Sequence, residues 1–312
     1  MPVKAHYRDF CSGAPDVPVF AQPWYLDACT HGGEWNVVLA REAGRVVAAL
    51  PYFYKQKGPF RYITMPPFVK WLGPYLLPEF RGQLLKEHEL LQVLLAQLPD
   101  CAAFKQNFFP TVTNWLPFYW EKYHQTTFYT YRLHQLRDLE QVQAGLGTGI
   151  RRDIRRARQR VRVVHDLPLD EFYRVNLLSF TRQGLPAPYS AAQFQRLDAA
   201  LATAGARQLF FAIDEQARVH SVAYLTWDAT TAYFLLAGDD PALRASGAGV
   251  LLAWEAIRYA SEVLNLDCFD FEGSMLPGVE RMRVRFGAVQ TPYFFVWKYN
   301  SRVFELLEKL KP

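Results

Sequence analysis

The sequence predicts an α/β (α+β) fold made of two similar units that follow one another along the chain. Short apolar strands alternate with amphipathic helices, and the order of these elements in the first half returns in the second half. One turn between a strand and a helix in the second half also carries two closely spaced glycines. Strands and helices that alternate in this way form sheets covered by helices. We therefore expect two domains, residues 1–136 and residues 137–312, each with a mixed, mostly antiparallel sheet flanked by helices.

The first half begins with a predicted β-hairpin, because two apolar runs flank the turn EAGR at 42–45. A Pro-rich loop later leads to a helix in which leucines recur at near-helical spacing. The expected elements of this half are the strands 37–39, 46–53 and 60–65, the helix 80–98, and the strands 102–108 and 128–133.

The second half repeats this order, again with a four-residue turn, EQAR at 215–218. Its expected elements are the strands 208–214, 220–227 and 233–237, the helix 250–260, and the strands 268–271 and 293–299. Residues 125–129 (QTTFY) also resemble residues 290–294 (QTPYF). A repeated order indicates a duplicated unit. The alternative is coincidence, since hairpins and βαβ units are common.

The turn 244–249 (RASGAG) is the most informative segment of the chain. Glycines let the backbone approach a ligand closely, and the first turn of a helix presents N–H groups that bind phosphate. An arginine adds a fixed positive charge. The residues expected to hold the phosphate are Arg244, Ser246, Gly247, Ala248 and Gly249. The corresponding turn of the first half, 79–83 (EFRGQ), has one glycine, so we expect a single donor site and a transferase.

The composition is that of a globular protein, because half of the 312 residues are apolar and 21% are charged. The net charge of +5 permits anionic ligands without requiring nucleic acid. The four cysteines form no C-x-x-C pair and the histidines show no ligand spacing, so we expect no metal site. The first residues lack the apolar core of a signal peptide, and no apolar stretch approaches the ~20 residues of a membrane span. We expect a cytoplasmic protein.

A strongly basic helix is predicted at 150–162, between the two halves. Its apolar residues fall on one stripe, and seven of the nine remaining positions are arginines. This pattern is typical of a solvated basic face on an ordinary amphipathic helix. The alternative is a surface that recognises phosphate or carboxylate groups, with Arg151 and Arg155 binding the substrate. Binding of tRNA is a further alternative, less favoured because the basic residues are confined to one helix.

Four segments of the chain match motifs of known proteins. The turn 244–249 resembles the R/Q-x-x-G-x-G/A loop that binds the acyl-CoA pyrophosphate in the GNAT acetyltransferase superfamily. Residues 154–163 (IRRARQRVRV) are similar to the I-R-K-A…V-x-V segment of FemAB-type proteins. Residues 269–287 resemble their D-F-x-G-S…G-x-x-x-F-K-x-x-F-G, and residues 65–74 resemble their P-x-x…G-P loop. The resemblance spans residues 24–298.

FemAB-type proteins contain two GNAT-like domains in tandem, so the resemblance implies that fold. The intact glycine loop implies acetyl-CoA or another acyl-CoA as co-substrate, as in FemAB- or BioF2-like acetyltransferases. The implied acceptor is an amine on an anionic cell-envelope or polysaccharide precursor that carries phosphate or carboxylate. One alternative is a FemAB-type peptidyltransferase that takes its donor from aminoacyl-tRNA and acts on peptidoglycan precursors. A third is a catalytically inert module that binds anionic ligands.

The chain departs from the FemAB-type pattern in two respects. It has no long helical arm, and Met282 and Arg283 stand where the F-K-x-x-F-G motif has phenylalanine and lysine. Arginine binds phosphate but stays charged and accepts no proton. We therefore expect Arg283 to bind substrate. Ser274, in the same segment, is a candidate for orienting the substrate.

N-acyl transfer needs a held thioester, a neutral amine and a base within hydrogen-bond reach of that amine. Asp270 and Glu272 are the candidates for the base, because alternation places both on one face of the strand after the donor helix. The alternative is that they bind backbone groups or arginines. Tyr293 is a candidate for protonating the departing thiolate, a role that resembles one seen among GNAT enzymes. Trp71 and Tyr75 are candidates for lining an acceptor cleft. For all three aromatic residues the alternative is core packing.

Overall fold

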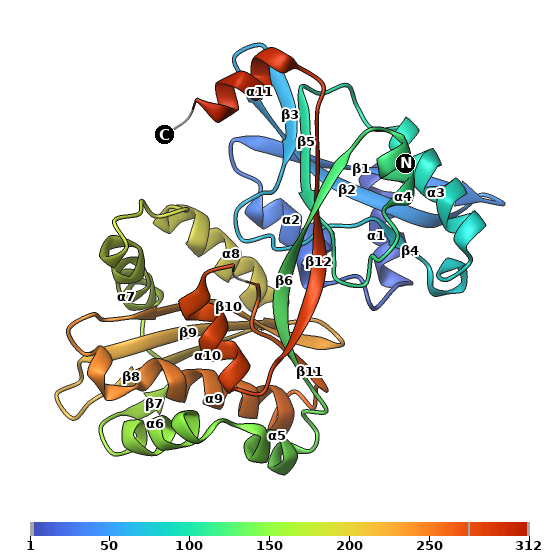
Figure 1. The fold of residues 1–312 in the computed structure, drawn as a ribbon. Helices are drawn as coiled ribbons and strands as arrows, with labels where there is room; N and C mark the ends of the chain where they lie inside the picture. The colour runs from blue at the N-terminus through green and yellow to red at the C-terminus, as the bar shows by residue number, and fades with distance from the viewer. Residues whose placement is uncertain (1–2, 274, 311–312) are drawn as a thin grey trace. The chain divides into compact units, whose positions relative to one another are not determined.

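The computed structural model describes residues 3–273 and 275–310, and the chain forms two compact units (Figure 1). The first unit contains residues 1–128 together with residues 292–312, and the second unit contains residues 129–291. Within the described residues, no helix combines the length and the apolar character that a bilayer span requires.

The compact units differ from the predicted domain limits. Two strands, β6 (His124–His134) and β12 (Val289–Tyr299), each carry the chain from one unit into the other. The first crossing therefore falls at residue 128 rather than at residue 136. The end of the chain returns to the first unit because β12 pairs antiparallel with β5 (Ala103–Asn107) there. In chain order, the second unit is thus an insertion into the first.

The sheet of the first unit has the strand order β1-β2-β3-β5-β12, with β4 beside β2. Its remaining strands are β1 (Gly33–Glu42), β2 (Arg45–Lys57), β3 (Phe60–Thr64) and β4 (Tyr75–Leu76). Strands β1 and β2 form the predicted antiparallel hairpin, whereas β3 and β5 run parallel. Parallel neighbours need a crossover connection, and α3 (Leu84–Ala96) lies within it.

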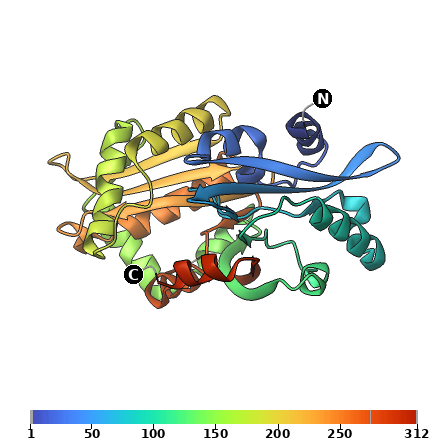
Figure 2. The same ribbon diagram turned by 90° about the horizontal axis from the view of Figure 1, so that it is seen from above.

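Helices cover both faces of the β1–β2 hairpin. Helix α1 (Val3–Ser12) and α3 both contact β1 and β2, and Figure 2 shows them on opposite sides of these strands. The other helices of this unit are η1 (Val19–Ala21), α2 (Pro23–Cys29), η2 (Pro78–Phe80), α4 (Leu116–Trp120) and α11 (Arg302–Lys309). The core is rich in aromatic side chains, and Trp35, Phe53 and Phe104 are almost fully buried in it.

The sheet of the second unit has the strand order β6-β11-β10-β9-β8-β7. Its strands after β6 are β7 (Arg162–Val164), β8 (Arg207–Ile213), β9 (Val219–Trp227), β10 (Thr231–Asp239) and β11 (Cys268–Asp270). Strands β8 and β9 form the second predicted hairpin. Strand β10 runs parallel to β11 over three residue pairs only, 231–233 with 268–270, so the two strands part early.

Helices also cover both faces of this second sheet (Figure 1). Helix α9 (Ala248–Glu262) and α6 (Thr148–Arg158) lie on one face, and α7 (Leu169–Arg182) lies on the other against β9 and β10. The apolar side chains of α6 and α9 pack with those of the sheet in one core, to which Leu251 and Phe269 belong. The unit further contains α5 (Leu139–Gly145), α8 (Ala191–Thr203), η3 (Arg244–Ser246) and α10 (Pro277–Arg285).

The two units share one element order. Each has an antiparallel hairpin, a further strand, a crossover helix and then a strand parallel to the one before that helix. The predicted fold class of two mixed, mostly antiparallel sheets with flanking helices is confirmed. The predicted helix 80–98 begins at Leu84 instead, because residues 78–80 form a separate 3₁₀ turn. Helices α7 and α8 lie where no element was predicted.

Candidate functional site

The glycine-rich turn connects β10 to α9 in the second unit. Residues 244–246 form a 3₁₀ turn, and Gly247 then adopts a left-handed conformation with φ 79° at the N-cap of α9. A side chain at Gly247 would be strained by this φ. Its Cβ would also lie 3.4 Å from the backbone oxygen of Asp153. The predicted turn is therefore present, and its geometry depends on Gly247.

The first turn of α9 satisfies most of its own amide groups. The Ala248 N–H donates to Ser246 Oγ at 3.3 Å, and the Val250 N–H donates to the Gly247 carbonyl at 3.1 Å. Among the described residues, the Gly249 N–H has no acceptor. The sequence predicted several free amides at this helix end, whereas the structure leaves one, because Ser246 is buried and caps the turn from within.

A cavity of about 510 Å³ opens beside this turn, within the second unit. Its wall includes the ends of β9 and β10, the C-terminal end of α7, the start of α9 and one side of α10. The β10–β9 register shifts between Phe234 and Leu236, so the strand carries a bulge beside the pocket. The charged residues that line the cavity are Arg182, Asp239 and Arg244. Arg182 and Asp239 were not predicted from the sequence, because neither belongs to the glycine motif.

Asp239 approaches the start of α9 closely. A Cβ atom at Gly249 would lie 2.6 Å from Asp239 Oδ1, so a larger residue there requires the Asp239 side chain to move. Ser221 Oγ donates to the same Oδ1 at 2.8 Å, and Arg244 Nε lies 3.5 Å from Oδ2. Arg244 is thus beside the pocket as predicted, but its nearest charged neighbour is a carboxylate of the protein.

The basic helix α6 lies alongside the same turn. Its apolar stripe is buried as predicted, whereas Arg151 and Arg155 are exposed. Just beyond the helix, Arg160 Nη1 donates to the Ala245 carbonyl at 3.0 Å. Arg156 Nη2 would be 3.6 Å from a Cβ on Gly247. The arginine surface therefore continues to the glycine turn.

Asp270 is fully buried and fully engaged. Its Oδ2 pairs with Arg132 Nε at 2.6 Å, and its Oδ1 accepts from Thr130 Oγ1 at 2.5 Å and from the Glu272 N–H at 2.8 Å. Burial lowers the pKa of the Arg132 guanidinium, but the adjacent Asp270 charge outweighs burial and keeps that pKa above its ordinary value. This geometry favours the alternative given for Asp270, an ion pair with an arginine, over the role of a base.

Glu272 does not share a strand face with Asp270. Strand β11 ends at Asp270, and Glu272 follows in a left-handed conformation with φ 53°. The predicted alternation is wrong at this point because the strand is only three residues long. A left-handed backbone is uncommon for a non-glycine residue and is maintained by the surrounding structure. Glu272 is half-buried, and Ser274 lies outside the described residues.

Arg283 is buried on α10. Its guanidinium carbon lies 5.9 Å from the centre of the Tyr131 ring, in a cation–π arrangement. The Tyr131 hydroxyl accepts from Gln290 Nε2 at 2.9 Å. Burial raises the pKa of Tyr131, and the neighbouring Glu280 adds to that rise. These contacts give Arg283 a packing role in addition to its predicted role in substrate binding.

The aromatic candidates lie in the first unit, where two of them share a cluster. The Trp71 ring is fully buried, and its centre lies 5.7 Å from that of Tyr293 and 5.9 Å from that of Phe109. The Phe128 ring lies 5.9 Å from Tyr293 on another side. These contacts favour core packing, the alternative given for Trp71 and Tyr293.

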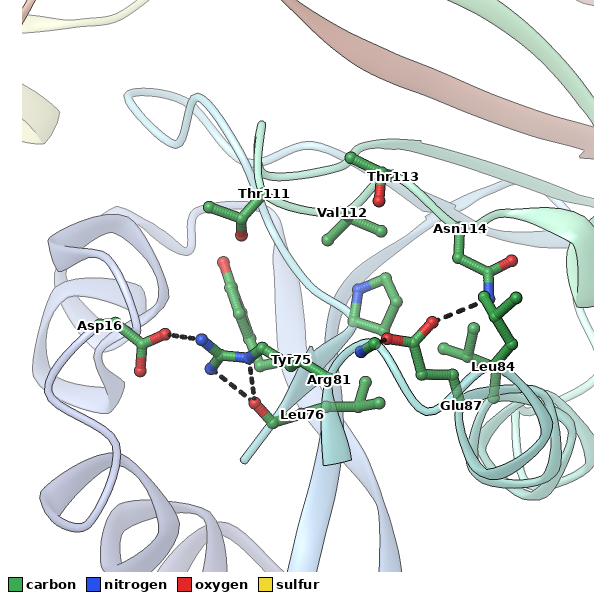
Figure 3. Close-up of a pocket in the computed structure, with 13 residues that line it drawn as sticks. Asp16, Tyr75, Leu76, Arg81, Leu84, Glu87, Thr111, Val112, Thr113 and Asn114 are labelled. Atoms are coloured by element: carbon green, nitrogen blue, oxygen red, sulfur yellow. Dashed lines mark hydrogen bonds and ion pairs between the residues drawn. The ribbon is translucent and has the colours of Figure 1, made fainter. Parts of the chain in front are cut away.

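Tyr75 lines a second cavity, of about 380 Å³, beside the turn that precedes α3 (Figure 3). The charged groups there are engaged within the protein. Arg81 donates to the Leu76 carbonyl through Nε at 2.8 Å and forms an ion pair with Asp16. Glu87 accepts from the Gly82 N–H at 2.7 Å and from Asn114 Nδ2 at 2.9 Å. This turn is the counterpart of 244–249 in the first unit.

A protein-family model described as "Acetyltransferase (GNAT) domain" matches residues 148–281. Residues 148–281 are therefore similar to GNAT domains. The sequence resemblance to the GNAT superfamily is thus confirmed for most of the second unit. A search of curated protein sequences found no significant match to the chain.

Solved structures extend the GNAT similarity to the whole chain. The crystal structure of FemX has a TM-score of 0.71 at 12% identity, with 99% of this chain and 98% of that chain covered. A tandem GNAT protein from the clavulanic acid biosynthesis pathway has a TM-score of 0.53 at 12% identity, with 95% and 94% covered. The C-terminal domain of a protein named as a putative lysylphosphatidylglycerol synthetase, from Agrobacterium fabrum, has a TM-score of 0.53 at 13% identity, with 88% of this chain and 87% of that chain covered. The chain therefore has a tandem GNAT, FemAB-like fold.

No group of three or more His, Cys, Asp or Glu side chains in the described part of the chain is arranged to hold a metal ion.

Proposed function

We propose that the protein is an acyltransferase that binds acetyl-CoA or another acyl-CoA in the pocket beside the 244–249 turn and transfers the acyl group to an amine. The observation that carries this proposal is the position of the turn. Its left-handed Gly247, its free Gly249 amide and Arg244 all lie at the mouth or edge of a cavity of about 510 Å³ inside the GNAT domain. A helix start with an adjacent arginine suits a pyrophosphate.

The reaction would join the amine nitrogen of the acceptor to the thioester carbonyl carbon and break the carbon–sulfur bond. The nitrogen loses a proton, which needs a base, and the leaving thiolate gains one. Of the two predicted carboxylates, Glu272 is the better candidate for the base, because Asp270 already accepts three hydrogen bonds in the core. Holding donor and acceptor together supplies most of the rate gain in such a transfer.

The acceptor we propose is an amine on an anionic cell-envelope or polysaccharide precursor. Exposed arginines of α6, among them Arg151 and Arg155, offer forked donors that match phosphate and carboxylate groups. Their helix is packed on α9, next to the donor turn. An anionic acceptor held there would be close to the donor pocket of the same unit.

A second candidate donor is aminoacyl-tRNA, as in a FemAB-type peptidyltransferase. The observation that favours it is the continuity between the arginine surface of α6 and the glycine turn, through Arg160 and Arg156. Such a surface would bind the phosphates of a tRNA end beside the pocket that receives the acyl group.

A thermal-shift experiment with acyl-CoA compounds tests the first proposal. A ligand at a hundredfold excess over its Kd stabilises the folded state by about 2.7 kcal/mol. We expect that shift for the unmodified protein and its loss in Arg244→Ala. If no acyl-CoA shifts the melting temperature and charged tRNA binds with a steep salt dependence, the tRNA-dependent candidate replaces it. Charge reversal at Arg151 and Arg155 would then weaken tRNA binding.

A further inference from the structure

The donor turn faces a carboxylate that belongs to the protein. Asp239 is the last residue of β10 and lines the pocket. Ser221 Oγ donates to Asp239 Oδ1 at 2.8 Å, and the backbone N–H of Asp239 donates to Ser179 Oγ at 3.2 Å. Side chains of β9 and α7 thus fix Asp239 from two directions. Its side chain remains 35% exposed to the pocket side, next to Arg244.

The position of Asp239 explains why glycine occupies position 249 without invoking a bound ligand. A Cβ atom at position 249 would lie 2.6 Å from Asp239 Oδ1, well inside van der Waals contact. Alanine at this position would displace the carboxylate from its observed place, although the motif of related proteins admits alanine there. The backbone of α9 has come as close to Asp239 as its glycine allows.

The carboxylate also suits the electrostatics of the helix end. The start of a helix carries a partial positive charge that favours a nearby anion, and α9 has no acidic residue in its own first turn. Arg244 Nε lies 3.5 Å from Asp239 Oδ2. Asp239 therefore occupies the neighbourhood in which the helix start and Arg244 would otherwise receive a phosphate group.

We propose that Asp239 weakens anion binding in the donor pocket, as an internal anion that competes with the donor phosphate for Arg244 and for the start of α9. This inference rests on the proposed function, because it concerns a phosphate-bearing donor. Two anions a few ångströms apart repel each other, and more strongly away from bulk water. Small free anions gain nothing that offsets the repulsion. A donor with a long acyl-bearing arm gains further contacts in the pocket and binds in spite of the repulsion, whereas inorganic phosphate and pyrophosphate bind weakly.

The next residue provides a matched control. Asp240 carries the same charge, but its Oδ1 accepts from the Ala242 N–H at 2.9 Å and it does not line the pocket. Asp239→Asn and Asp240→Asn change the net charge of the protein equally. Asparagine has the shape of aspartate, so both variants retain the packing around the turn.

Calorimetric titration of the full chain with pyrophosphate and with CoA tests the inference. We expect Asp239→Asn to bind pyrophosphate and CoA about tenfold more tightly than the unmodified protein, and Asp240→Asn to stay within about twofold. If the two variants had equal effects, Asp239 would act only through the net charge of the protein, and the inference would be overturned. Weaker binding by Asp239→Asn would also overturn it, because Asp239 would then be positioning Arg244 for the donor.

The outcomes separate this inference from the proposed function. If CoA binds both the unmodified protein and Asp239→Asn equally, the inference fails and the acyl-CoA donor stands. If CoA binds neither, the acyl-CoA donor fails, and pyrophosphate still decides the inference. Pyrophosphate binding gained in Asp239→Asn supports competition by Asp239, and binding that is unchanged or absent in both overturns it.

A stability measurement examines the contact between Asp239 and Gly249 without any ligand. Gly249→Ala should lower the melting temperature of the unmodified protein, because the new Cβ meets Asp239 Oδ1. The same substitution should be tolerated in the Asp239→Ala background, where that carboxylate is gone. An equal loss in both backgrounds would show that Asp239 is not the reason for glycine at 249 and would contradict the inference.

Discussion

The turn before α3 and the turn before α9 occupy equivalent places in the two units, but the strands around them differ. In the first unit, Leu72 forms a parallel bridge with Phe108 where β3 and β5 end. The Leu72 N–H donates to the Asn107 carbonyl at 2.9 Å, and Gln106 Nε2 donates to the Gly73 carbonyl at 3.1 Å. The Pro-rich loop thereby fills the edge of β5.

In the second unit, β10 and β11 part after three residue pairs, and a cavity opens at the end of β10. The charged groups beside the first turn are paired within the protein, as Arg81 is with Asp16. Beside the second turn, Arg182 and Arg244 line the cavity together with Asp239, whose Oδ2 lies 3.5 Å from Arg244 Nε. Both turns therefore border a cavity, of about 380 Å³ and about 510 Å³, but only the second cavity opens at the end of the strand that precedes the crossover helix.

The largest expected effect comes from substituting the left-handed glycines of the two turns. Gly247 and Gly82 have nearly the same φ, 79° and 78°, so valine imposes similar strain at both, about 1–2 kcal/mol. We expect Gly247→Val to abolish the acyl-CoA thermal shift and Gly82→Val to retain it. If both variants lost the shift, acyl-CoA binding would depend on the integrity of the whole fold and could not be assigned to the 244–249 turn.

The next effect separates the two carboxylates near the end of β11. Glu272→Gln should reduce kcat about 10²–10⁴-fold if Glu272 is the base, with little change in stability. Asp270→Asn leaves buried Arg132 without its counterion and should cost about 3–5 kcal/mol in the free energy of unfolding. Turnover assays and urea unfolding of both variants measure this. A large loss of kcat in Asp270→Asn, with Glu272→Gln retaining activity, would instead indicate that Asp270 is the base.

The loop that covers the edge of β5 is expected to contribute to stability but not to donor binding. Trp71 is fully buried in the loop that covers the edge of β5, so Trp71→Ala should lower the free energy of unfolding by about 3–5 kcal/mol. Urea unfolding gives that value, and acyl-CoA titration should show an unchanged Kd. A large rise in Kd would give Trp71 the substrate role predicted from the sequence.

The smallest effect concerns the hairpin turns. In the β8–β9 turn, a hydrogen bond from His220 and the Arg218 guanidinium hold the pKa of Asp214 well below its usual range. A lowered pKa contributes stability above the unfolded value of about 4, and this contribution fades as the pH falls further. Asp214→Asn should therefore lower the melting temperature at pH 7, by an amount that shrinks below pH 4. A difference that is constant with pH would exclude this ionic contribution.

Local patterns explain what could be predicted from the sequence. Both hairpins, the crossover helix after Gly249 and the buried stripe of α6 follow from short-range periodicity and turn composition. The repeated order then predicted the tandem fold. The 163–206 segment, which contains α7 and α8, has no equally clear counterpart in the first half, so the repeated order predicts no elements there.

The site depends on contacts between distant segments, and these could not be predicted. The ion pair of Asp270 requires the β6–β11 register, which sets Arg132 opposite Asp270. The contact of Asp239 with Gly249 requires β10 to end against the start of α9. A sequence motif names residue types at one turn, whereas the carboxylates and arginines around that turn come from other elements of the fold.

The central claim is that the chain has a single donor site, at the 244–249 turn. Its most direct test is the stoichiometry of acetyl-CoA binding, measured by calorimetric titration of the full chain. One molecule should bind per chain, and Gly247→Val should remove that binding. Two molecules per chain would show that the first unit also holds a donor. Binding that survives Gly247→Val would contradict the assignment of the donor site to the 244–249 turn.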